Sequence, residues 1–176
     1  MTKTILFPGL LFSFLMSNAQ RQLPQTWIRK MPVVNDSLYV NKERQKSLST
    51  YHTAANKERK NILVFSAGTR NTKDHDALFI GRLEKKEVYK VNAPAIVSKN
   101  IAETEKNLDL IFSDAARSQA VLFFDGADEL FSKTKQPEAI ANYIQALAQA
   151  KNVMTIFWCE EDCLPWLGKS KYVLVQ

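Results

Sequence analysis

The chain lacks the features that mark membrane-spanning, nucleic-acid-binding and disordered proteins. Its apolar run Ile5–Met16 is too short to cross a bilayer as a helix, and Pro8 interrupts it. No arginine-rich segment interleaved with aromatic residues occurs, so we expect no nucleic-acid partner. The formal net charge of +6 is spread among mixed charges, as on an ordinary solvated surface. With 45% hydrophobic and 24% charged residues, the composition is that of a globular domain.

Cysteine and histidine are scarce, which argues against redox and metal chemistry. Cys159 and Cys163 have neither the CxxC spacing of thiol oxidoreductases nor that of half a zinc site. His52 and His75 are the only histidines that could complete such a site. We therefore expect no metal site. The two cysteines could pair in an oxidising compartment, but spacing alone does not guarantee disulfide geometry, and we expect two free thiols.

The N-terminus has the pattern of an export signal. Lys3 precedes the apolar run, and the small residues of Ser17–Ala19 predict cleavage before Gln20. We predict a signal peptide over residues 1–19, which resembles those of Bacteroidetes-type bacteria. No stable membrane span would remain after cleavage, and the protein would be periplasmic or secreted. The alternative is a buried N-terminal strand or helix in a cytoplasmic protein.

Strands and helices alternate along most of the remaining chain. Residues 20–59 are polar and are interpreted as an N-terminal extension, with a helix from about Val40 to Arg59 whose thin apolar stripe is Leu48, Tyr51 and Ala55. Residues 60–176 form the predicted α/β domain. Its strands are predicted at 61–66, 87–92, 119–125, 153–158 and 172–175, and its helices at 72–83, 101–117 and 137–150. This order predicts a three-layer α/β/α sandwich with a five-stranded, mainly parallel sheet.

Two sequence words in this domain carry a family resemblance. SKNIAETEKNL begins at Ser98 and leads into a helix, and FFDGADELF ends an apolar strand at Asp125. In this order and at this separation they resemble the core of AAA-type (P-loop) ATPases. The resemblance covers roughly residues 60–176 and implies a P-loop fold without the family's helical lid.

The phosphate loop that this resemblance implies is degenerate. The family pattern GxxxxGKT wraps phosphates with backbone N–H groups, neutralises them with its Lys and holds magnesium with its Thr. In the best register Phe65, Arg70 and Asn71 replace the two glycines and the lysine, while Lys73 lies one position beyond the pattern. The vestigial nucleotide- and magnesium-binding positions are Gly68, Thr69, Thr72 and Asp125.

The other catalytic positions of the family are also altered. Asp125 stands where the family carries its magnesium-associated Asp, although it could equally be a strand-end carboxylate that caps the next turn. Gly126 replaces the Glu that polarises the attacking water, and Trp158 falls where a polar sensor residue is usual. Lys169 and Lys171 are the only cations near the expected arginine finger. We expect no catalytic residue.

These residues favour a catalytically inactive, exported AAA-like domain. It would act as a binding or structural module for an unidentified protein partner and would need no cofactor. The alternative is an ATP-binding AAA-family protein or a silent subunit of a cytoplasmic AAA ring, with ATP and magnesium bound at the vestigial site. A gene copy that has lost its function is a further alternative. Both a monomer and a homo-oligomer are compatible with the sequence.

Overall fold

Six strands form one sheet in the order β1-β3-β4-β5-β2-β6. They are β1 (Ile28–Lys30), β2 (Ile62–Phe65), β3 (Val88–Asn92), β4 (Val121–Asp125), β5 (Thr155–Trp158) and β6 (Val173–Val175). All residues of β2, β4 and β5 are buried except Asp125, as their continuous apolar runs predict for strands covered on both faces. The computed structural model describes residues 23–32, 40–65, 69, 71–159, 164–168 and 172–175.

The five predicted strands are present, and each pairs in parallel with its neighbours among the five. A sixth strand, β1, was not predicted and pairs antiparallel with β3 at the edge of the sheet. Only Ile28 in this three-residue strand is apolar, since Arg29 and Lys30 follow it, so hydrophobic alternation cannot reveal it.

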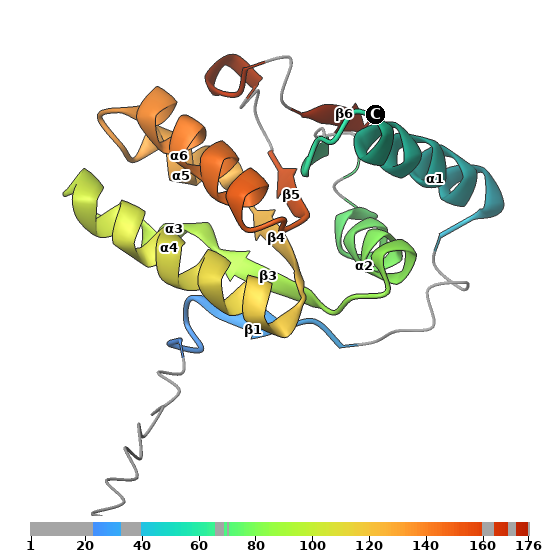
Figure 1. The fold of residues 1–176 in the computed structure, drawn as a ribbon, viewed down its shortest axis with the longest axis horizontal. Helices are drawn as coiled ribbons and strands as arrows, with labels where there is room; N and C mark the ends of the chain where they lie inside the picture. The colour runs from blue at the N-terminus through green and yellow to red at the C-terminus, as the bar shows by residue number, and fades with distance from the viewer. Residues whose placement is uncertain are drawn as a thin grey trace, which may run out of the picture.

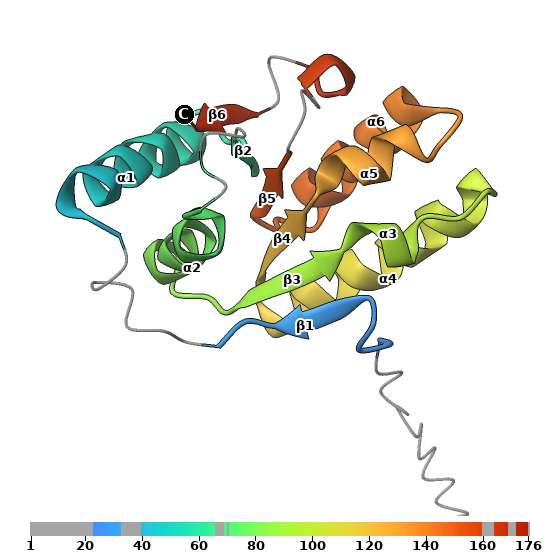
Figure 2. The ribbon, with the colours of Figure 1, turned by 180° about the vertical axis from the view of Figure 1, so that it is seen from behind.

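Helices cover both faces of the sheet, so the predicted three-layer α/β/α sandwich is confirmed. The longer helices are α1 (Lys42–Lys57), α2 (Lys73–Glu84), α4 (Ile101–Ser118) and α6 (Pro137–Ala150), and the short ones are α3 (Ala93–Ile96), α5 (Ala127–Ser132) and the 3-10 turn Leu164–Trp166. Figures 1 and 2 show α1 and α2 on one side of the sheet and α4, α5 and α6 on the other. The helix predicted at 137–150 has the predicted ends. It begins at Pro137, since proline is favoured in the first turn.

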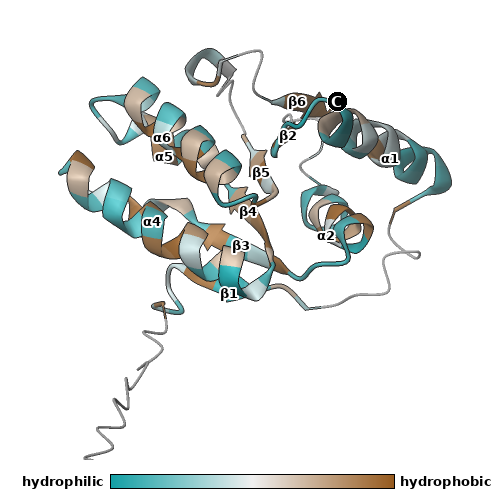
Figure 3. Ribbon diagram, viewed as in Figure 1, coloured by the Kyte–Doolittle hydropathy of each residue, from teal (hydrophilic) through white to brown (hydrophobic). Residues whose placement is uncertain are grey.

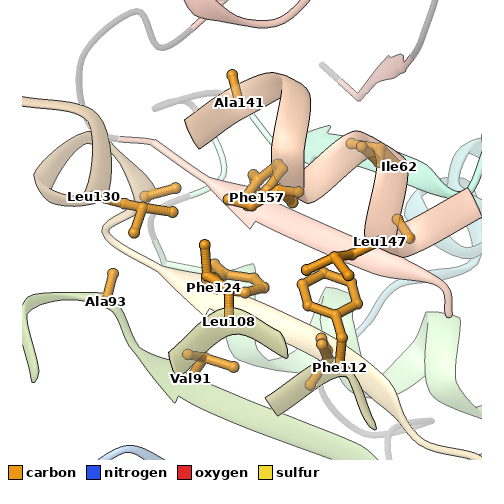
Figure 4. Close-up of a cluster of buried hydrophobic side chains, with 14 of the residues drawn as sticks. Ile62, Val91, Ala93, Leu108, Phe112, Phe124, Leu130, Ala141, Leu147 and Phe157 are labelled. Atoms are coloured by element: carbon orange, nitrogen blue, oxygen red, sulfur yellow. The ribbon is translucent and has the colours of Figure 1, made fainter. Parts of the chain in front are cut away.

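Alternate strand residues divide the interior into two cores. Leu122 and Phe124 of β4 join the core under α4 and α6, whereas Val121 and Phe123 join the core under α1 and α2. Figure 4 shows the first core, in which Phe124 and Phe157 lie with their ring centroids 5.1 Å apart. Side chains on both faces of the sheet are therefore buried.

The N-terminal extension contributes α1 to the second core. Most of this helix is hydrophilic (Figure 3), yet Leu48 and Ala55 are fully buried. These are two of the three residues of the predicted apolar stripe, and the third, Tyr51, packs against the same core. The boundary at residue 60 remains a prediction.

None of the helices in the described ranges combines the length and apolar character needed to span a membrane. The predicted signal peptide at residues 1–19 lies outside these ranges.

Candidate functional site

The carboxyl ends of four parallel strands place four residues in one row. Asn92 is in register with Asp125, Asp125 with Trp158, and Trp158 with Phe65. Ligand sites of open parallel sheets lie outside this edge. Phe65 is fully buried and Trp158 is 4% exposed. Two bulky aromatic side chains therefore occupy half of the row.

Both carboxylate oxygens of Asp125 contact lysine ammonium groups. Lys73 at the start of α2 lies with Nζ 2.6 Å from Oδ1, and Lys90 of β3 lies with Nζ 2.6 Å from Oδ2. Lys90 Nζ also lies 2.8 Å from Oδ1 of Asp74. We call Lys73, Asp74, Lys90 and Asp125 the strand-end ion cluster. Its formal charges sum to zero, since it has two cations and two anions.

The ammonium group of each lysine also lies over an aromatic ring of a strand residue. Lys73 Nζ lies 3.7 Å from the centroid of the Trp158 ring, and Lys90 Nζ lies 5.4 Å from that of Phe123. Both distances are within the range of cation–π attraction. Trp158 therefore binds Lys73 at the position where a polar sensor residue was expected.

The two lysines keep the Asp125 carboxylate ionised. Burial by itself raises the pKa of this carboxyl group. The hydrogen bonds from Lys73 and Lys90, with their positive charges, outweigh burial and hold the pKa below its ordinary value.

The hydroxyl of Thr72 is engaged within the protein. Its Oγ1 donates to Oδ2 of Asp76 over 2.9 Å. Asp76 is completely buried, and the same oxygen accepts hydrogen bonds from Nε (3.1 Å) and Nη2 (2.8 Å) of Arg44 on α1. Thr72 thus belongs to a network that ties α1 to the first turn of α2.

The predicted site residues are only partly brought together. Asp125 and Thr72 lie in the described ranges with the side-chain partners given above, and Thr69 is 4% exposed. Gly68 lies outside the described residues. Asn71, which aligns with the family's lysine, is exposed.

Sequence reasoning missed the roles of Lys73 and Lys90. Lys73 was noted only as lying beyond the loop pattern, yet its ammonium group reaches Asp125. One signal was present for Lys90, because it is a lone charge in the half-buried strand VYKVN. A charge in such a strand requires a partner.

Cys159 is disulfide-bonded, so the expectation of a free thiol is wrong at this position. The other cysteine of the chain, Cys163, lies outside the described residues. Within the described residues, no group of three or more His, Cys, Asp or Glu side chains could hold a metal ion.

Comparison with known proteins assigns the fold. Residues 77–162 match the model of the family described as "ATPase family associated with various cellular activities (AAA)". The chain has an AAA-type core. The match includes the two sequence words that carry the resemblance and Asp125 at the end of β4.

Solved structures agree with this assignment at the level of the fold. The FIGL-1 AAA domain in complex with ADP matches with a TM-score of 0.58 and 13% identity over 85% of this chain. A chain of the E. coli MS115-1 HORMA:CdnC:Trip13 complex matches with a TM-score of 0.52 and 12% identity, also over 85%. This chain covers 57% and 68% of those chains. Comparison with curated protein sequences gave no significant match.

Proposed function

We propose that this AAA-type domain works without ATP hydrolysis, as an exported module that binds or supports a protein partner. The observation that carries this proposal is the strand-end ion cluster. Magnesium requires oxygen ligands at about 2.0–2.1 Å in near-octahedral geometry. Both oxygens of Asp125 are instead engaged by ammonium groups at 2.6 Å.

Magnesium could bind Asp125 only by displacing Lys73, Lys90 or both. A displaced Lys73 would lose its carboxylate partner while only 22% of its side chain is exposed, and a displaced Lys90, 13% exposed, would keep Asp74 alone. Uncompensated charge in such surroundings costs several kcal/mol. The ion cluster therefore opposes metal binding and stabilises the fold in its place.

The neighbouring positions also fit a magnesium nucleotide poorly. The hydroxyl of Thr72 donates its hydrogen bond to Asp76 and not to Asp125, the other vestigial magnesium position. Phe65 is fully buried at the end of β2, where the pattern requires a glycine. Gly126 has no carboxylate to polarise water. None of these three positions therefore favours a bound magnesium nucleotide.

Export is supported by two independent features. One is the signal-like pattern of residues 1–19. The other is the disulfide-bonded Cys159, since disulfides persist mainly in oxidising compartments. Mass spectrometry of the mature protein tests this part of the proposal. A chain that begins at Gln20 is expected, and an intact Met1 would contradict export.

A protein partner is the proposed ligand of the module. The E. coli neighbour is part of a complex of several proteins, which shows that this fold is compatible with such assemblies. We propose that protein binding is the activity that this chain retains after its nucleotide site was lost.

Isothermal titration calorimetry with magnesium-ATP tests the nucleotide part. Folded wild-type protein, checked by near-ultraviolet circular dichroism, is expected to give no saturable heat at millimolar nucleotide. The matched variant Asp125→Asn should behave identically. Micromolar binding that needs magnesium and weakens in Asp125→Asn would contradict the proposal.

That outcome would favour the second candidate, a nucleotide-binding AAA-type protein or silent ring subunit. Its support is the retention of Thr72 and Asp125, together with a structural neighbour that is complexed with ADP. An unprocessed N-terminus would support the same candidate.

A further inference from the structure

A pocket lies at the carboxyl edge of the parallel strands, on the side of β1. Its volume is about 350 Å³, which falls at the small end of the range for small-molecule sites. The lining residues are Gln25, Thr26, Ile28, Arg29, Lys90, Val91, Asn92 and Asp125. Half of these come from the N-terminal segment, so the pocket exists because β1 adds to β3 (Figure 2).

Hydrogen bonds attach the N-terminal segment firmly to β3 at this pocket. The backbone N–H of Asn92 donates to the carbonyl oxygen of Trp27 over 2.9 Å, and its side-chain amide donates to that of Thr26 over 3.1 Å. The backbone that carries Arg29 is therefore positioned by main-chain pairing rather than by a flexible loop.

The pocket has one positive charge in excess. Arg29 lies directly opposite Lys90 in the antiparallel pair, and like charges in such pairs repel. Lys90 is neutralised by Asp74 and Asp125. Within the described part of the chain, the guanidinium group of Arg29 has no hydrogen-bond or ion-pair partner. The guanidinium group of Arg29 therefore supplies the charge that attracts an anion to the pocket.

We propose that this pocket binds the oxyanion group of a small molecule, a carboxylate or a phosphate. The guanidinium group of Arg29 can donate two parallel hydrogen bonds to either group. Ile28, which is only partly buried, offers apolar contact to the body of the ligand. The site uses the β1 side of Asp125, away from β2 and the degenerate phosphate loop that follows it.

Calorimetric titration of the full chain at constant ionic strength tests the proposal, with sodium benzoate and inorganic phosphate as separate probes. At least one probe should show saturable binding. Tighter binding of benzoate would identify a carboxylate ligand with an apolar body, and tighter binding of phosphate a phosphorylated one. Arg29→Gln should weaken binding at least about tenfold, as expected for the loss of a charged hydrogen bond.

Lys30→Gln is the matched control. It removes the same charge from the next residue of β1, whose ammonium group pairs with Glu87 rather than entering the pocket. Binding by Lys30→Gln should stay within about twofold of wild type, because distant surface charge is screened. A second variant, Thr26→Asp, places a carboxylate in the pocket and should also abolish binding.

Three results would overturn the proposal. They are the absence of saturable binding of both probes, an equal loss in Arg29→Gln and Lys30→Gln, and unchanged binding in Thr26→Asp. Nucleotide binding at the vestigial site would need magnesium and would persist in Arg29→Gln, whereas anion binding in the pocket would need no magnesium and would weaken in that variant. Failure of one proposal is thus distinguishable from failure of the other.

Discussion

Lys73 and Lys90 determine the chemistry around Asp125. Each ammonium group contacts one carboxylate oxygen, and the two lysines come from different elements, α2 and β3. Partly buried charges of this kind are stable only as a set, because removal of one member leaves the others uncompensated. The cluster therefore links the start of α2 to two neighbouring strands.

The depressed pKa of Asp125 predicts an acid-sensitive contribution to stability. Because the folded-state pKa lies below the ordinary value of about 3.9, the contribution is complete above that pH and is lost as the pH falls through the folded-state pKa. At pH 7, Asp125→Asn should lower the free energy of unfolding by about 1–3 kcal/mol. The difference between wild type and variant should shrink progressively below about pH 4. Urea unfolding of both proteins at pH 7, 5, 4 and 3 measures this difference in the free energy of unfolding.

Asp114→Asn provides the control for this prediction. Asp114 pairs with Arg117 three residues away on α4, and the Arg117 side chain is 54% and the Asp114 side chain 23% exposed. The exposed fraction of Asp114 matches that of Asp125, but its single partner is open to solvent, so the pair contributes little and the variant should lose less than about 0.5 kcal/mol. A pH-independent difference between wild type and Asp125→Asn would show that the carboxylate does not act through its charge.

At the residue scale the sequence predicts the position of Asp125 but not its partners. The strand before Asp125 is strongly apolar and ends at a charge, which locates the carboxylate at the sheet edge. Lys73 and Lys90 lie 52 and 35 positions earlier in the chain. Their contacts with Asp125 depend on strand order and helix placement, which local patterns do not contain.

Helix ends show a second feature that sequence patterns miss. Arg59, Lys85, Gln119 and Asn152 have φ angles of 50–55° and follow α1, α2, α4 and α6 respectively. This left-handed conformation is favoured by glycine, yet none of the four is glycine. Each helix-to-strand turn therefore carries a small conformational cost.

Gln119→Gly should consequently stabilise the protein. The left-handed conformation costs a residue with a side chain about 1–2 kcal/mol, and the greater chain entropy of glycine in the unfolded state offsets about 0.5–1 kcal/mol of the gain. We expect a net increase of about 0.5–1 kcal/mol in the free energy of unfolding, measured by urea denaturation. Ser118→Gly, one residue earlier and still helical, should instead destabilise by a similar amount. Destabilisation by both substitutions would refute the explanation.

Gly81 has a different role within α2. A Cβ atom at this position would lie 2.4 Å from Cγ2 of Val88 and 3.1 Å from the carbonyl oxygen of Lys86. Alanine is the better helix former, yet Gly81→Ala should lower the free energy of unfolding by about 1–3 kcal/mol because of this overlap. Adding Val88→Ala should recover part of the loss. No recovery in the double variant would mean that the backbone contact with Lys86 dominates.

At the scale of the whole molecule, most of the architecture could be predicted from the sequence. The five parallel strands and the long helices follow from apolar runs and helical periodicity, both of which are local signals. The edge strand β1 could not be predicted in the same way, and the predicted apolar stripe of α1 is too thin to show where this helix packs. β1 has one apolar residue, and α1 buries only Leu48 and Ala55. Both elements are positioned by long-range contacts with the sheet.

These contacts predict that the N-terminal extension is needed for folding. A chain that begins at residue 60 would lose β1 and α1, expose the second core where Leu48 and Ala55 are buried, and leave the buried carboxylate of Asp76 without Arg44. An unpaired buried charge alone costs about 3–5 kcal/mol, a large part of a typical domain's stability. Residues 60–176 should therefore show no cooperative urea transition, whereas residues 23–176 should unfold like the chain from residue 20. A cooperative transition of residues 60–176 at the midpoint of the longer chains would show instead that the α/β part is stable alone and that residues 20–59 are an accessory segment.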